Sequence, residues 1–170
     1  AYFPRPATPA EGDWAAYRAV NRAFAQAAAE SGRGESAWVH DYQLGLVPAE
    51  LRAAGYRGRI GFFLHTPVPR LAVAAEVLDG AGQALFGEWL RGLLGADLVG
   101  FQCPADVERF LEAVQALGLG GVEGSAVIQE GHRLRAGAFP VGIDFEEVAE
   151  IAPTAQLPAI AQEARAPGLP

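Results

Sequence analysis

Residues 59–69 read RIGFFLHTPVP, an apolar run that stops at a histidine and is followed at once by two prolines. The continuous apolar segment 60–64 is typical of a strand that is buried on both faces of a parallel sheet. Pro67 and Pro69 have no backbone N–H to donate, so the sheet cannot continue through them. Two interpretations of His65 follow: it is a structural residue where the chain turns, or it lies at the mouth of a ligand cleft.

The composition of the chain indicates a globular protein of about one domain. It has 170 residues, of which 51% are hydrophobic and 19% charged, with a net charge of -7. The negative charge and the lack of a basic run argue against nucleic acid or an anionic membrane as a partner. The single cysteine, Cys103, excludes an intrachain disulfide. Without a membrane-spanning stretch or a signal-peptide pattern, we expect a cytoplasmic protein, and the abrupt start without methionine suggests a fragment.

Strand and helix patterns alternate along the chain. Strands are predicted at 36–40, 59–65 and 96–101, helices at 14–31, 48–54, 71–79, 83–94 and 104–117, a glycine-rich loop at 118–124, a hairpin around Glu130-Gly131, and a last helix after Asp144. Apolar strands that alternate with helices predict an α/β fold with a parallel, Rossmann-like sheet and helices on both faces.

Polar residues follow the predicted strands at the edge where such sheets bind ligands. The first strand ends at His40 and Asp41, the second at His65, and the third at Gln102 and Cys103. We therefore expect Asp41 and His65 to lie at matching ends of two strands. For Cys103, which would cap a helix, plain packing is favoured over a reactive thiol.

Several common catalytic motifs are absent from the sequence. There is no GxGxxG after a strand, no GxxxxGK[ST] and no GxSxG. No serine or cysteine nucleophile accompanies Asp41 and His65, and no metal-ligand spacing is present. A sugar phosphatase of doubly wound fold would need a DxDx-type loop, which HDYQL at 40–44 does not supply.

Five motifs, in order and at similar spacing, resemble those of the trehalose-6-phosphate synthase family. They are DWAAYRAVN (13–21), WVHDYQLGLVPAELR (38–52), RIGFFLHTPVP (59–69), LLGADLVGFQCP (93–104) and RAGAFPVGID (135–144). The resemblance implies one half of a two-domain, retaining glycosyltransferase that moves glucose from UDP-glucose, or a related nucleotide sugar, to glucose 6-phosphate. Residues 1–152 would be a partial N-terminal, acceptor-side domain, and 153–170 an Ala/Pro-rich tail or the start of an interdomain segment.

The resemblance also implies roles for individual residues. Asp41 matches the residue that hydrogen-bonds the acceptor sugar, His65 one that contacts the donor glucose, and Thr66 a position linked to selection of the α anomer. Catalysis would depend on positioning and charge stabilisation, with no metal and no cofactor beyond the nucleotide-sugar substrate. On the helix 14–31, Trp14, Tyr17 and Asn21 are interpreted as packing residues, and Gly142 and Asp144 would shape the passage to the second domain.

The departures from the family pattern leave alternatives open. Where many relatives read HIPFP, this chain reads His65-Thr66-Pro67-Val68-Pro69, and threonine after the histidine also occurs in glucosylglycerol-phosphate synthases. The glycine-rich donor loop and the C-terminal domain that holds the nucleotide phosphates are missing from the given sequence. The segment alone is therefore expected to be inactive, and a truncated, non-catalytic or regulatory homologue is a further alternative. The full-length protein could also form a homo-oligomer.

Overall fold

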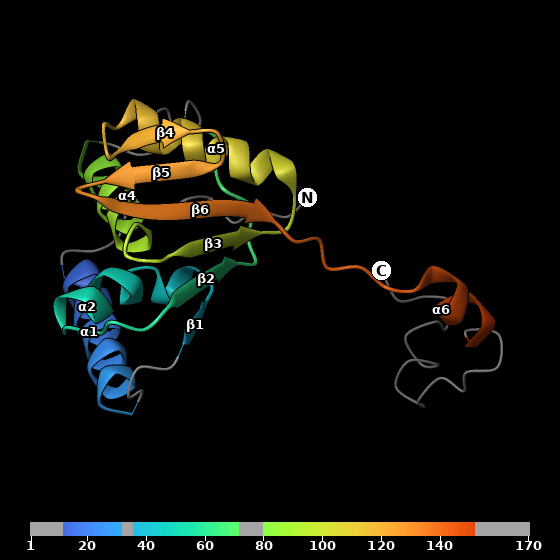
Figure 1. Cartoon of the computed structure of the whole chain (residues 1–170), viewed down its shortest axis with the longest axis horizontal. Helices are drawn as coiled ribbons and strands as arrows, with labels where there is room; N and C mark the ends of the chain where they lie inside the picture. Colours follow the sequence, from blue (N-terminus) through green and yellow to red (C-terminus); the bar gives the residue numbers. More distant parts are fainter. Residues whose placement is uncertain (1–11, 32–35, 72–79, 152–170) are drawn as a thin grey trace, which may run out of the picture. The chain divides into compact units, whose positions relative to one another are not determined.

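The computed structural model describes residues 12–31, 36–71 and 80–151, and the chain divides into two units, 1–140 and 141–170. The helices are α1 (Asp13–Ser31), the 3-10 helix η1 (Tyr42–Leu44), α2 (Val47–Ala53), α4 (Gly80–Leu93), α5 (Pro104–Ala116) and α6 (Phe145–Ile151). The strands are β1 (Ala37–His40), β2 (Ile60–Leu64), β3 (Leu98–Phe101), β4 (Gly121–Glu123), β5 (Ala126–Gln129) and β6 (His132–Ala138) (Figure 1). The predicted helix at 71–79 falls, after Leu71, outside the described residues.

The first unit is built on one six-stranded sheet with the strand order β1-β2-β3-β6-β5-β4. Strands β1, β2, β3 and β6 pair in parallel with one another, in that order, which confirms the α/β class and the parallel arrangement. The sheet is mixed because the predicted hairpin, β5–β6, adds an antiparallel pair. The prediction of a loop throughout 118–124 was wrong, since Gly121–Glu123 pairs with β5 as strand β4, between turns at Gly118 and Gly124 with positive φ.

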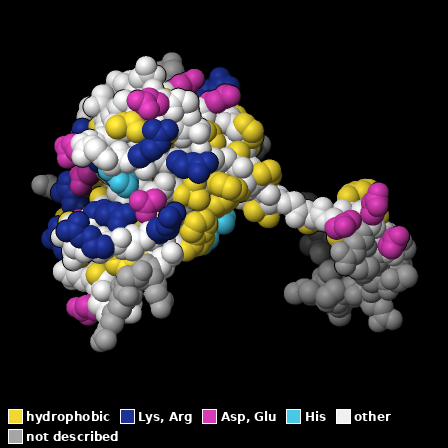
Figure 2. All heavy atoms as spheres, in the orientation of Figure 1, with side chains coloured by type: hydrophobic (Ala, Val, Ile, Leu, Met, Phe, Trp, Pro, Cys, Tyr) yellow, Lys and Arg dark blue, Asp and Glu magenta, His cyan; other side chains and the backbone are white. Residues whose placement is uncertain are grey.

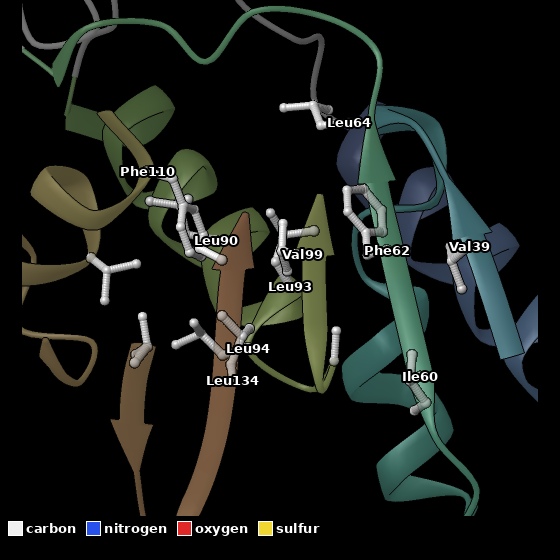
Figure 3. Packing of buried hydrophobic residues seen from close by; sticks show 14 of the residues in the cluster. Val39, Ile60, Phe62, Leu64, Leu90, Leu93, Leu94, Val99, Phe110 and Leu134 are labelled. Carbon is white, nitrogen blue, oxygen red and sulfur yellow. The ribbon is translucent and has the colours of Figure 1, made fainter. Parts of the chain in front are cut away.

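The core lies between one face of the sheet and the helices. Phe62 of β2 and Val99 of β3 are fully buried on this face, where they belong to the same cluster as Leu90 and Leu93 of α4 and Phe110 of α5 (Figure 3). Side chains of a strand alternate between its two faces. The even-numbered residues of β2 therefore face the helices, and the odd-numbered residues face away from them.

The opposite face of the sheet carries Trp38 and Phe63 from adjacent strands, with Phe139 just after β6. The side chains of Trp38 and Phe139 are about half exposed, whereas Phe63 is buried. A Cβ atom added to Gly61 would come within 2.1 Å of the Trp38 ring, so the indole lies directly on the β2 backbone. Figure 2 shows hydrophobic side chains gathered on the side turned to the viewer, over the region where β2 and β3 lie in Figure 1.

An arginine holds the starts of two central strands together. The Arg52 guanidinium donates to the carbonyl of Gly95 at 3.1 Å and to Oδ2 of Asp97 at 2.8 Å. The same carboxylate oxygen accepts the backbone N–H of Ile60 at 2.7 Å. These bonds fix the relative positions of α2, β2 and β3 at the end of the sheet away from the polar strand ends.

Two glycines of helix α4 are expected to respond to alanine substitution in opposite directions. A Cβ at Gly92 would lie 2.4 Å from the carbonyl oxygen of Gly45, so Gly92→Ala should lower the free energy of unfolding by about 1–3 kcal/mol. A Cβ at Gly87 meets its nearest atom at 3.6 Å, so Gly87→Ala should raise it by about 0.5–1 kcal/mol. Urea unfolding of both variants tests this, and a Gly92→Ala protein as stable as wild type would refute the close approach.

The second unit contains α6, which begins directly after Asp144 as predicted. Its Phe145 and Val148 side chains are exposed. The predicted tail, 153–170, lies outside the described residues, so the boundary placed there stays a prediction. Among the described helices, none combines the length and the apolar character that crossing a bilayer requires.

Candidate functional site

The candidate site lies where the parallel strands β1 and β2 end. The two strands are in register with His40 opposite Phe63, and the Asp41 N–H donates to the carbonyl of Phe63 at 2.8 Å. His65 follows β2 by one residue. The structure therefore brings Asp41 and His65 together at neighbouring strand ends, on the edge where parallel α/β sheets bind ligands.

The Asp41 backbone is held in an unusual conformation, with φ 66° and ψ 167°. Only a few per cent of residues other than glycine adopt a positive φ, and the cost is on the order of 1–3 kcal/mol. This turn lets Oδ1 of the carboxylate accept the N–H of Tyr42 at 3.0 Å and that of His65 at 3.3 Å. Asp41 thus caps η1, while its Oδ2 accepts no hydrogen bond from the described part of the chain.

The exposed ring of His65 lies against that of His40. Nδ1 of His40 and Nε2 of His65 are 2.9 Å apart, and the two rings meet edge to edge, with 5.2 Å between centroids and 19° between their planes. The Phe63 ring lies 4.7 Å from that of His65. The sequence motifs assign no role to His40, although the alternation of side chains along a strand places it on the same open face as Trp38.

Thr66 lies apart from this histidine pair. It lines a pocket of about 180 Å³ between the segment after β2 and helix α4, together with Tyr42, Phe86 and Trp89. The alternation of side chains explains the separation, because successive residues leaving β2 point to opposite faces. The site residues predicted from the sequence are thus divided between two adjacent surfaces.

Helix α1 holds the segment that follows Asp41. The buried Asn21 donates through Nδ2 to the carbonyl of Gln43 at 3.0 Å, and its Oδ1 accepts the N–H of Leu46 at 3.0 Å. The Tyr17 hydroxyl donates to the carbonyl of Tyr42 and accepts the N–H of Gly45. These contacts confirm the interpretation of Tyr17 and Asn21 as packing residues.

The third residue of that helix face, Trp14, makes a different contact. Its indole N–H donates to Oε2 of Glu88 in α4 at 2.9 Å, and the Arg18 guanidinium donates to both oxygens of the same carboxylate. Hydrogen bonding from Arg18 holds the pKa of the Glu88 carboxyl below its usual value. The predicted packing role of Trp14 is therefore also confirmed, and it joins α1 to α4.

Tyr17 makes the stability of the protein sensitive to alkaline pH. Burial raises the pKa of its hydroxyl above the ordinary 10.0, although the Gly45 N–H acts in the opposite direction. The hydroxyl therefore stabilises the fold fully below about pH 10, and this contribution is lost as the pH rises through the folded-state pKa.

We expect Tyr17→Phe to lower the free energy of unfolding by about 0.5–1.5 kcal/mol near neutral pH, because the Gly45 N–H loses its bond to the hydroxyl and keeps only the longer one, at 3.3 Å, to the Tyr42 carbonyl. The difference between variant and wild type should shrink above about pH 10. Urea unfolding of both proteins, from neutral pH to above about pH 10, measures this difference in the free energy of unfolding. A difference that stays constant with pH would contradict the assignment.

A buried carboxylate holds the segment that follows His65. Asp106, near the start of α5, accepts the N–H of Val68 at 3.1 Å through Oδ1. Arg109 donates to the same oxygen at 3.0 Å and to the Val68 carbonyl. Cys103 donates its thiol to Oδ2 at 3.0 Å. The chain that leaves His65 is thus anchored at Val68, and Cys103 takes part in that anchor.

Other predicted residues are not joined to the site by the structure. Gly142 and Asp144 belong to the second unit, so their expected position at the passage between domains stays a prediction. Among the described residues there is no group of three or more potential metal ligands.

The chain matches known proteins along most of its length. A model of glycosyltransferase family 20 covers residues 4–166. The chain is 42% identical over 149 residues to a bifunctional trehalose-6-phosphate synthase/phosphatase of Thermoproteus tenax, covering 85% of this chain and 19% of the relative. It is 40% identical over 163 residues to a trehalose-6-phosphate synthase of Mycolicibacterium gilvum, covering 90% of this chain and 31% of the relative.

Solved structures show the same likeness. An α,α-trehalose-6-phosphate synthase from Burkholderia multivorans superposes with a TM-score of 0.78 at 27% identity, covering 94% of this chain and 34% of that one. A UDP-forming enzyme from Burkholderia xenovorans, in complex with glucose-6-phosphate, gives a TM-score of 0.71 at 33% identity, covering 89% and 34%. The chain thus spans about a third or less of these relatives, and over that span it belongs to glycosyltransferase family 20.

Proposed function

We propose that this chain is part of a glucosyltransferase that moves glucose from UDP-glucose to glucose 6-phosphate and releases trehalose 6-phosphate and UDP. The family match and the names of the relatives support the reaction type. The observation that carries the proposal is the meeting of Asp41 and His65 at the ends of β1 and β2.

The geometry suits Asp41 for binding a sugar acceptor. Its Oδ1 is occupied by two backbone N–H groups, which fix the carboxylate in place. Its Oδ2 is left to accept from a hydroxyl group, and such charge-assisted hydrogen bonds are stronger than neutral ones. We assign Asp41 to orienting the acceptor, rather than to acting as a general base.

His65 and Thr66 are assigned to the side of the reacting glucose. His65 is exposed at the strand end and contacts His40, while its backbone N–H contacts the Asp41 carboxylate. Its ring would contact the donor glucose, and Thr66 would lie near the face that selects the α anomer. The segment after β2 is held rigidly in two ways. Pro67 and Pro69 restrict its backbone, and the Val68 N–H is bound to the Asp106 carboxylate.

The proposed mechanism retains the anomeric configuration without a covalent enzyme intermediate. The diphosphate leaves on the face where the acceptor hydroxyl attacks, and a phosphate oxygen of the leaving group takes the hydroxyl proton. The protein contributes position and charge stabilisation, and the scheme uses no metal ion and no cofactor besides the nucleotide-sugar substrate. The second domain of the same enzyme would bind the nucleotide phosphates.

The sequence His65-Thr66 supports glycerol 3-phosphate as a second candidate acceptor, because threonine also follows this histidine in glucosylglycerol-phosphate synthases, which use that acceptor. Steady-state release of UDP by the full-length enzyme, with each acceptor supplied separately, distinguishes the two. We expect the larger kcat/KM with glucose 6-phosphate. Preference for glycerol 3-phosphate would reassign the acceptor, and no UDP release with any sugar phosphate would favour a non-catalytic homologue.

The 170-residue chain alone is expected to transfer no glucose, because the groups proposed to bind the diphosphate lie in another domain. Their loss removes electrostatic stabilisation of the leaving group, which is usually a large part of the rate enhancement. The measurement is UDP release by the purified segment beside the full-length enzyme at equal concentration. Transfer by the segment would mean that it contains a donor site of its own.

A further inference from the structure

We propose that His40 is a positioning residue that holds the ring orientation of His65 and couples the choice of protonated nitrogen on His65 to that on His40. The inference rests on the proposed function, because it concerns how His65 meets the donor glucose. Its basis is the 2.9 Å contact between His40 Nδ1 and His65 Nε2, together with the small angle of 19° between the planes of the two rings.

The contact restricts where protons can be. A neutral imidazole has one N–H donor and one bare acceptor nitrogen, so a bond between two rings needs a proton on one of the facing nitrogens and none on the other. If His40 donates, Nδ1 of His65 carries its proton. If His65 donates, its Nδ1 is a bare acceptor and Nε2 of His40 carries a proton. The two outward nitrogens therefore form one donor and one acceptor.

These two outward nitrogens are the ones left for a ligand. Neither Nδ1 of His65 nor Nε2 of His40 is hydrogen-bonded within the part of the chain that the structure describes, and both side chains are exposed. A sugar hydroxyl is both a donor and an acceptor. The pair can thus match either hydrogen-bonding direction of a hydroxyl when both rings change tautomer together: the bridge proton moves from one facing nitrogen to the other, while one outward nitrogen loses a proton to solvent and the other gains one.

The surroundings of the pair keep the rings from turning freely. The Trp38 ring meets that of His40 edge-on at 5.7 Å, and Phe63 lies against His65 at 4.7 Å. The Trp38 ring itself packs directly against the backbone of Gly61, which has no side chain. On the other side, the His65 backbone is bound to Asp41. An aromatic row along the open face of β1 and β2 therefore supports the His40–His65 bond.

Two variants of the full-length enzyme separate the hydrogen bond from the ring contact. In His40→Asn, the side-chain amide places a polar atom near the position of Nδ1, so it can still bond to Nε2 of His65. In His40→Phe, the ring remains and the hydrogen bond is lost. His132→Gln is the matched control, because His132 contacts the Ala96 carbonyl before β3, at the opposite end of the strands.

We expect His40→Phe to lower kcat by about 10- to 100-fold, as misplacement of a reacting group does, with little change in KM for UDP-glucose. His40→Asn should recover most of the loss, and His132→Gln should behave as wild type. Wild-type kcat in His40→Phe would overturn the proposal. So would a His40→Asn enzyme as slow as His40→Phe, since the hydrogen bond would then not matter.

Imidazole ¹⁵N chemical shifts of His65 provide a test that does not depend on turnover. They report which ring nitrogen carries the proton, and they should change in His40→Phe and much less in His40→Asn. Unchanged shifts in His40→Phe would overturn the proposal, even if the variant were inactive or less stable. If the wild-type enzyme transfers glucose to no acceptor, the proposed function fails, while these shifts still decide whether His40 controls His65.

Discussion

Replacement of His65 by alanine in the full-length enzyme is expected to lower kcat by about 100- to 1,000-fold, the usual cost of losing one group that stabilises the transition state. Stability should change little. The side chain is exposed and its hydrogen bond is to another exposed side chain, so its removal opens no cavity in the core. The His65 backbone bond to Asp41 remains in the variant.

The thermal midpoint and the transfer rate should be measured on the same His65→Ala preparation, with His132→Gln as the control. A large fall in rate with a nearly unchanged midpoint supports a functional histidine. If the variant unfolds while its folded fraction keeps normal turnover, the other interpretation from the sequence is correct. His65 would then be a structural residue that happens to precede two prolines.

Asp41→Asn is expected to impair use of the acceptor without disturbing the fold. Asparagine has the same shape as aspartate, and its Oδ1 can still accept the N–H groups of Tyr42 and His65 that hold this backbone conformation. The negative charge is lost, however, and a hydrogen bond to a charged group contributes about 1.5–3 kcal/mol. The kcat/KM for glucose 6-phosphate should therefore fall about 10- to 150-fold.

Isothermal titration with UDP is the control for the Asp41→Asn variant, and UDP affinity should stay near that of wild type. Asp41→Gly provides a complementary comparison, since glycine relieves the positive φ but removes the cap on η1. A large loss of UDP affinity in Asp41→Asn would place this residue on the donor side, or show that its role is structural.

Local sequence patterns predicted the strands and helices well because they depend on neighbouring residues. The apolar run of β2 and the turn of the β5–β6 hairpin are examples. Strand β4 was missed because Gly121 and the glycines on either side of the strand are typical of loops, and its pairing with β5 stabilises it instead.

The long-range hydrogen bonds that hold the site in place could not be predicted in the same way. Asn21 binds Leu46, and Asp106 binds Val68, across long separations in the sequence that no local pattern encodes. The likeness to a known family pointed to Asp41, His65 and Thr66 but assigned no role to His40. The pairing of His40 with His65 required the register of β1 and β2, which only the folded chain provides.

A crystal structure of the full-length enzyme with UDP and glucose 6-phosphate bound tests the central claim most directly. We predict that Oδ2 of Asp41 lies within about 3 Å of an acceptor hydroxyl, as a hydrogen bond requires, with the His65 ring beside the reacting centre. An acceptor bound away from the ends of β1 and β2, with Asp41 bonded only to the Tyr42 and His65 backbone, would contradict the account.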